Sequence, residues 1–112
     1  MNIYLISNES YRLIAEEIKK IVKENTYKIF NLNKSSIEEI IEEANYFSLD
    51  GNSKYLVVSN ADIFSSDKSD DNTTNLVLKY LENPNSNTIL IFTTQKPIDT
   101  RKKIVKEIKT KY

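Results

Sequence analysis

Carboxylates and lysines are the side chains in this chain that could do acid–base or metal chemistry, because histidine and cysteine are both absent. The missing residues exclude Ser–His and Cys–His catalysis, disulfides and thiolate metal sites. The densest carboxylate group is Glu38, Glu39, Glu42 and Glu43. Its i, i+4 pairs lie on the expected outer face of a helix, whereas tuning a carboxylate for catalysis requires burial. A solvated helix face is therefore the preferred interpretation of this group.

Residues 7–12 are the place where a nucleotide-binding α/β domain would cradle phosphate, directly after its first strand. Such a loop needs glycines, so that backbone N–H groups can approach the phosphate, and a P-loop also needs a lysine. The segment reads SNESYR, and the only glycine of the chain is Gly51. It also lacks the pair of acids typical of a phosphoreceiver domain. We therefore expect no cofactor at this position.

Short apolar runs alternate along the chain with amphipathic segments, and this alternation predicts the fold class. Runs with strand character lie at 3–7, 27–32, 55–58 and 88–93, and each is followed by apolar residues at helical spacing. The pattern predicts an α/β domain with three layers, a parallel sheet with helices on both faces. The run at 55–58 is the most apolar in the middle of the chain and should be a strand buried on both faces.

Local signals set the expected limits of the helices. Ser35 and Glu38 fit a capping box at the start of the second helix. Asn83-Pro84 should end a third helix that runs from about residue 73, and Asp99 should cap the last one. The polar run 67–74 reads as a surface loop or a partly disordered one. The expected buried stripes are Ile14, Ile18, Ile21 and Val22; Ile37, Ile40, Ile41 and Ala44; Leu76, Val77, Tyr80 and Leu81; and Ile104, Val105 and Ile108.

The composition is that of one ordinary globular domain. The 112 residues carry no net charge, from 16 basic and 16 acidic residues, which argues against a dedicated nucleic-acid binder. No apolar run approaches the length of a membrane span, and we expect a cytoplasmic protein. The chain ends on a basic segment: Arg101, Lys102, Lys103, Lys106, Lys109 and Lys111. That segment is either a solvated helix face or a patch for acidic partners or a phosphate backbone.

The ends of the two later strands resemble those of AAA+ ATPases without their catalytic groups. In such ATPases the third strand ends in a run like Asp-Glu-Ala-Asp, whose acids orient magnesium and polarise the attacking water. Here Ser59-Asn60-Ala61-Asp62 puts neutral side chains at those two positions. Thr93-Thr94-Gln95 is similar to the polar sensor of the next strand. We therefore expect a degenerate AAA+ or P-loop NTPase-like domain with no catalytic, metal or cofactor-binding residues.

Tyr46, Phe47 and Leu49 form an apolar tip between the second helix and the third strand. Phe47 follows the helix's buried stripe by a few residues, so it can be a core residue closing the junction. Leu49 lies inside the polar stretch 48–53 and has little neighbouring chain to pack on. Clustered exposed apolar groups usually mark a partner site, where aromatic anchors carry much of the affinity.

Three segments together resemble the N-terminal domain of the delta subunit of bacterial DNA polymerase III, a component of the sliding-clamp loader. They are IEEIIEEA at 37–44 leading into FSL at 47–49, KYLVVSNAD at 54–62, and YLENP at 80–84 followed by TILIF at 88–92. The resemblance covers essentially all of the chain. It implies an AAA+ fold that neither binds nor hydrolyses ATP, in a non-catalytic subunit of a DNA-directed DNA polymerase holoenzyme.

The resemblance also implies a mechanism and partners. A hydrophobic wedge enters a pocket on the sliding clamp (the beta subunit) and opens the ring, which requires higher affinity for the open clamp than for the closed one. Leu49 matches the wedge leucine, with Tyr46 and Phe47 as the other clamp-binding candidates. Asp50 stands where the family often has a second large apolar residue, so Phe47 or Tyr46 supplies the second anchor or the affinity is reduced.

The family's middle and C-terminal domains, which hold the other clamp-loader subunits, are not in these 112 residues, so we expect a fragment of a longer chain. Contact with DNA should be indirect or weak. Two alternatives remain at this stage. One is a small α/β hydrolase or nucleotide-using domain. The other is a structural α/β module whose function lies in a missing C-terminal part.

Overall fold

The computed structural model of the chain describes residues 2–46, 51–66 and 71–111. The strands are β1 (Ile3–Ser7), β2 (Lys28–Asn31), β3 (Lys54–Ser59) and β4 (Thr88–Thr94). The helices are α1 (Tyr11–Val22), α2 (Ile37–Asn45), α3 (Asp71–Glu82) and α4 (Lys103–Lys111), with a 3₁₀ turn, η1, at Asp62–Phe64. None of the described helices combines the length and apolarity that a bilayer crossing requires.

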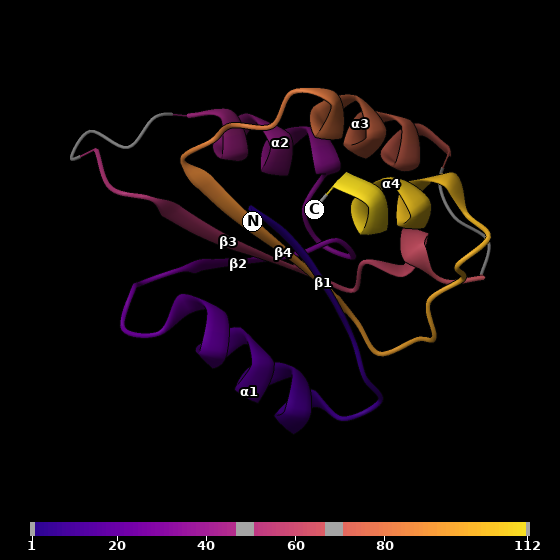
Figure 1. Cartoon of the computed structure of the whole chain (residues 1–112), viewed down its shortest axis with the longest axis horizontal. Helices are drawn as coiled ribbons and strands as arrows, with labels where there is room; N and C mark the ends of the chain where they lie inside the picture. The colour runs from indigo at the N-terminus through magenta and orange to yellow at the C-terminus, as the bar shows by residue number, and fades with distance from the viewer. Residues whose placement is uncertain (1, 47–50, 67–70, 112) are drawn as a thin grey trace.

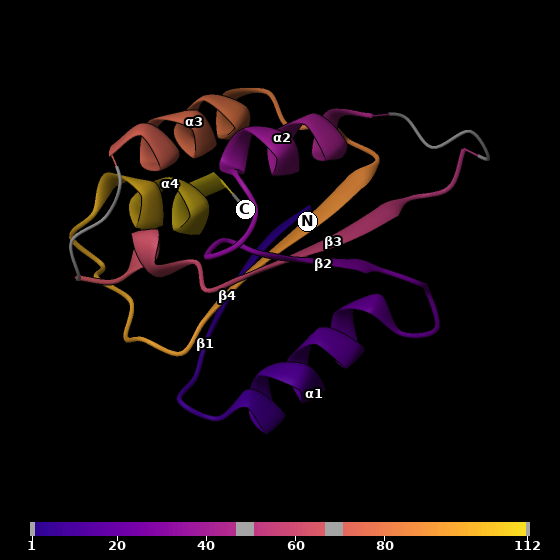
Figure 2. The ribbon, with the colours of Figure 1, turned by 180° about the vertical axis from the view of Figure 1, so that it is seen from behind.

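The four strands form one parallel sheet in the order β1-β4-β3-β2. Helix α1 covers one face, and α2, α3 and α4 cover the other (Figures 1 and 2). The predicted three-layer α/β architecture is therefore confirmed. Strand β3 lies between two neighbours, and Leu56, Val57 and Val58 are each at most 1% exposed. The prediction of a strand buried on both faces is also confirmed.

Alternation along the strands divides the core into two, because successive side chains of a strand point to opposite faces. Val57 and Ile91 pack under α1, against Ile14, Ile18 and Val22. Leu56, Val58, Leu90 and Phe92 belong to the larger core, which is formed with α2, α3 and α4. Within that core the rings of Phe64 and Phe92 lie 5.0 Å apart between centroids. The predicted stripes are mostly buried, whereas Ile21, Ile41 and Leu76 lie at the margins and are partly exposed.

The start of α2 differs by one residue from the predicted capping box. The hydroxyl of Ser36 accepts a hydrogen bond of 3.2 Å from the Glu39 amide, so Ser36 is the N-cap. Ser35 lies in the turn after β2, where its amide donates to the carbonyl of Asn31. The prediction of Ser35 and Glu38 as the box was wrong, because the adjacent pair Ser36 and Glu39 has the same spacing and only the turn geometry distinguishes them.

The starts of α3 and α4 also differ from the predictions. Helix α3 begins at Asp71, so the second half of the polar run 67–74 is helical, while 67–70 lies outside the described residues. Asp99 does not cap α4, which begins at Lys103. The Asp99 carboxylate accepts hydrogen bonds from the Arg101 amide at 3.0 Å and from the Arg101 guanidinium at 3.0 and 3.1 Å. Asp99 therefore closes a turn before the helix. The end of α3 at Glu82, before Asn83-Pro84, is as predicted.

Candidate protein-interaction site

Tyr46 is the one predicted tip residue that lies within the described part of the chain. It is the C-cap of α2, with extended backbone dihedrals, and 61% of it is exposed. Phe47 and Leu49 lie outside the described residues, as does Asp50. The structure thus describes the base of the predicted tip, formed by the end of α2 on one side and the start of β3 on the other.

Side chains from the start of β3, the start of β4 and the loop before β4 donate to carbonyl groups at the end of α2. The Lys54 ammonium donates to the carbonyls of Glu43 (2.7 Å) and Tyr46 (2.8 Å). The Ala44 carbonyl accepts from Asn85 Nδ2 at 3.2 Å and from the buried Thr88 hydroxyl at 2.7 Å. The last carbonyls of a helix have no partner within the helix, so these bonds fix its end to the starts of β3 and β4.

Glu43 behaves differently from the other three glutamates of its helix. Its carboxylate lies 2.8 Å from Lys28 Nζ and 3.9 Å from Lys54 Nζ, and 25% of its side chain is exposed. The hydrogen bond from Lys28 holds the pKa of Glu43 below its ordinary value. Glu38, Glu39 and Glu42 are exposed, as predicted, but the assignment of Glu43 to the solvated outer face was wrong.

An open groove of about 750 Å³ runs along the amino-terminal ends of β2 and β3, beside the base of the tip. Its lining is mainly polar: Asn25, Thr26, Tyr27, Lys28, Glu43, Asn52, Ser53, Lys54 and Tyr55. The groove therefore offers hydrogen-bonding groups to a ligand. Among the described residues, no group of three or more carboxylates could hold a metal ion there or elsewhere.

At the opposite end of the sheet, where an ATPase would bind its nucleotide, several polar side chains bond to neighbouring groups of the fold. Asn60, with a left-handed φ of 56°, donates through Nδ2 to Asn31 Oδ1 at 2.7 Å. The Ser59 hydroxyl donates to the carbonyl of Phe30 at 3.4 Å. Ser59 and Asn60, which stand at the predicted positions of the ATPase acids, therefore connect β3 to β2.

The predicted sensor residues are likewise used in contacts within the fold. The Thr94 hydroxyl donates to Asp62 Oδ1 at 2.9 Å, and Gln95 Nε2 donates to the Glu9 carbonyl at 2.9 Å. Lys96 Nζ forms an ion pair of 3.3 Å with the other oxygen of Asp62. Both oxygens of the acid nearest this strand end are thus occupied by neighbouring side chains.

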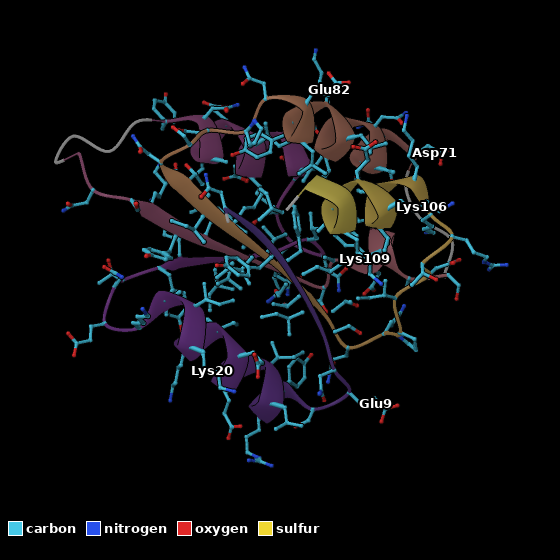
Figure 3. The ribbon with its side chains drawn as sticks, in the orientation of Figure 1. Glu9, Lys20, Asp71, Glu82, Lys106 and Lys109 are labelled. Atoms are coloured by element: carbon cyan, nitrogen blue, oxygen red, sulfur yellow. The ribbon has the colours of Figure 1, made fainter. Side chains whose placement is uncertain are left out.

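The basic helix α4 lies away from the C-terminal end of α2. In both views α4 and the C-terminal end of α2 lie at opposite sides of the helical layer (Figures 1 and 2). Lys106 and Lys109 extend from α4 (Figure 3), and both are exposed. Lys102 instead donates to the Ile63 carbonyl at 3.1 Å.

No local pattern in the sequence singles out Lys54, whose ammonium bonds to the carbonyls of Glu43 and Tyr46. A cation near the last turn of a helix is a familiar C-terminal signal. Lys54, however, is nine residues beyond Asn45, where α2 ends, and it belongs to the next strand. Only the return of the chain along the sheet brings its ammonium to the end of α2.

Comparison with known proteins agrees with this architecture. The family model of the DNA polymerase III delta subunit matches residues 2–112. A search of curated proteins finds no match. The solved structure of the DNA clamp loader delta protein (YqeN) of Bacillus subtilis superposes with a TM-score of 0.80 at 18% sequence identity.

That match includes 97% of this chain and spans 36% of the Bacillus subtilis chain. It confirms the predicted AAA+-like α/β fold, since the backbone is shared across nearly all of this chain. The family match extends over almost every residue, so it is the sequence that identifies the family. The chain belongs to the DNA polymerase III delta subunit family.

Proposed function

We propose that this chain is the clamp-contacting domain of a clamp-loader delta subunit. It binds the bacterial sliding clamp through an apolar wedge made of Tyr46, Phe47 and Leu49, and it favours the open ring because the wedge has higher affinity for that state. The observation that carries the proposal is Tyr46, a large aromatic residue 61% exposed at a rigidly bonded helix end, in a chain of the delta family.

The domain acts without nucleotide chemistry of its own. The neutral residues Ser59 and Asn60 stand at the strand end where an ATPase carries its acids, and Asp62 is bonded to Thr94 and Lys96. A carboxylate held in this way is poorly placed to act as a general base. These contacts support a protein-interaction module over a hydrolase or another nucleotide-using domain.

The chain corresponds to one domain, residues 1–112, of a longer delta subunit. Its match to 36% of the Bacillus subtilis delta protein supports this. Contacts with the other clamp-loader subunits are then made by the remainder of that protein, and DNA is reached through the clamp. The zero net charge and the separation of α4 from the C-terminal end of α2 agree with a minor role for direct DNA contact.

Titration calorimetry of this chain with the bacterial sliding clamp tests the proposal. We expect Phe47→Ala and Leu49→Ala each to weaken binding about tenfold or more, because anchors at the centre of an interface carry most of its energy. Leu13→Ala is the matched control, since Leu13 is an exposed leucine on α1, on the other face of the sheet. If the clamp binds but neither tip variant weakens it, the wedge assignment is wrong. If the unaltered chain shows no binding, clamp recognition by this domain is wrong.

A further inference from the structure

We propose that Lys54 is the positioning residue of the clamp-binding tip, holding its base in the geometry that binds. This inference rests on the proposed function, because it concerns the same site. It assigns a role in clamp binding to Lys54, a charged residue of β3 that is not part of the apolar wedge.

The Lys54 ammonium joins the two ends of the chain segment that carries the tip. Its two short hydrogen bonds go to the carbonyls of Glu43 and Tyr46, at 2.7 and 2.8 Å. The same ammonium lies 5.9 Å from the centroid of the Tyr46 ring and 3.9 Å from the Glu43 carboxylate. An ammonium has three donors, and these acceptors surround it on the side of α2.

The other end of the Lys54 residue is fixed to the sheet. Its amide donates to the Asn87 carbonyl at 2.8 Å, and β3 pairs with β4 from Lys54 onward. Only 18% of its side chain is exposed, so solvent screens these charge-assisted bonds less than it would screen those of a surface lysine. Tyr46, at the start of the tip, is therefore tied through one side chain to the first residue of β3.

This tie matters for binding because ordering a segment costs conformational entropy. If the end of α2 and Tyr46 are already ordered in the free protein, the entropy cost of ordering them is part of folding. It then does not reduce the free energy of binding to the clamp. Loss of the tie should weaken binding without removing any group that touches the clamp pocket.

Lys28 provides a matched comparison within the same groove. It has the same charge and also pairs with the Glu43 carboxylate, at 2.8 Å, but its side chain is 66% exposed. If Lys54 acted only by attracting an acidic partner, loss of Lys28 would have a similar effect. If Lys54 acts by holding the helix end, only its own loss should matter.

The first arm of the test measures binding of this chain to the bacterial sliding clamp. We expect Lys54→Met to weaken binding about tenfold, Lys28→Met to change it less than about threefold, and Lys54→Arg to recover part of the loss. In a Leu49→Ala background, Lys54→Met should add little, since a positioning residue acts through the wedge. Independent, additive losses, or equal losses for the two lysines, would overturn the proposal.

The second arm needs no clamp. Amide hydrogen exchange should show faster exchange at Tyr46 in Lys54→Met than in the unaltered chain or in Lys28→Met, with exchange within α1 unchanged. Unchanged exchange at Tyr46 overturns the positioning role even if affinity falls. Absence of clamp binding by the unaltered chain overturns the proposed function instead, and the exchange data still decide whether Lys54 holds Tyr46. Lys54→Gln, which keeps side-chain donors, replaces Lys54→Met if the latter does not fold.

Discussion

The hydroxyl of Thr94 lies 2.9 Å from Oδ1 of Asp62, and Lys96 Nζ lies 3.3 Å from Oδ2 of the same carboxylate. Thr94 is the last residue of β4, and Asp62 is the first residue of the 3₁₀ turn after β3. Both lie at the carboxyl ends of the strands, where open parallel α/β sheets bind their ligands. In this chain the Asp62 carboxylate bonds to Thr94 and Lys96 instead, so these groups connect elements of the fold.

We therefore predict that nucleotide does not stabilise this chain. Bound ligand would raise the free energy of unfolding by about 2.7 kcal/mol at a concentration of 100 times Kd. We expect magnesium-ATP to leave the thermal midpoint unchanged in scanning fluorimetry. Restoring acids with Ser59→Asp and Asn60→Glu should not create binding either, because residues 7–12 contain no glycine to admit phosphate. A rise of the midpoint with ATP in the unaltered chain would contradict the prediction.

Asp50→Phe should strengthen clamp binding if the tip is the wedge. Leaving water costs a carboxylate much of its hydration, whereas a buried phenylalanine side chain contributes about 1.5–3 kcal/mol. We expect an increase in affinity of about tenfold by calorimetry. Asp50→Asn is the control, since it removes the charge with little added apolar surface and should give a smaller gain. An unchanged affinity for Asp50→Phe would mean that residue 50 does not enter the pocket.

The two adjacent serines before α2 should differ in their contribution to stability. Ser36→Ala removes the hydroxyl that accepts from the Glu39 amide and should lower the free energy of unfolding by about 1 kcal/mol. Ser35→Ala, one residue earlier, should change it by no more than about 0.5 kcal/mol. Urea denaturation of both variants measures the difference. Equal losses would show that the cap is shared between them.

The ion pair between Glu43 and Lys28 should make stability depend on pH in the acid range. The folded-state pKa of Glu43 lies below its ordinary value of 4.5, with the Lys28 hydrogen bond as the largest cause. Its contribution is therefore fully present above pH 4.5 and is lost as the pH falls through the lower folded-state pKa.

Urea denaturation between pH 6 and pH 3 measures this effect. We expect the stability advantage of the unaltered chain over Glu43→Gln to shrink as the pH falls through this range. Lys28→Met should flatten the difference, because it removes the main cause of the depressed pKa. A constant advantage across the range would show that Glu43 titrates alike in the folded and unfolded states.

Much of the fold could be predicted because burial repeats locally along the chain. The alternation through Leu56, Val57 and Val58 and the helical spacing of Ile14, Ile18 and Val22 follow directly from side-chain direction in strands and helices. The sheet order and the crossovers then have few solutions. The family was also within reach of the sequence, since ordered segments across the whole chain carry it.

The site could be predicted only in part. Its apolar residues Tyr46, Phe47 and Leu49 are visible as a cluster in a polar stretch, although the structure describes Tyr46 alone of the three. The choice of Ser36 over Ser35 as the cap depended on the turn after β2, and both serines fit the same local pattern.

Sequence alone determined the alternation of strands and helices, the missing catalytic groups and the apolar character of the tip, because each of these depends on residue type and short-range spacing. Tertiary structure decided that Lys54 meets the carbonyls of Glu43 and Tyr46. These partners lie eleven and eight residues before Lys54. They come within 3 Å of its ammonium because the larger core packs α2 on the sheet, which brings the end of the helix to the first residue of β3.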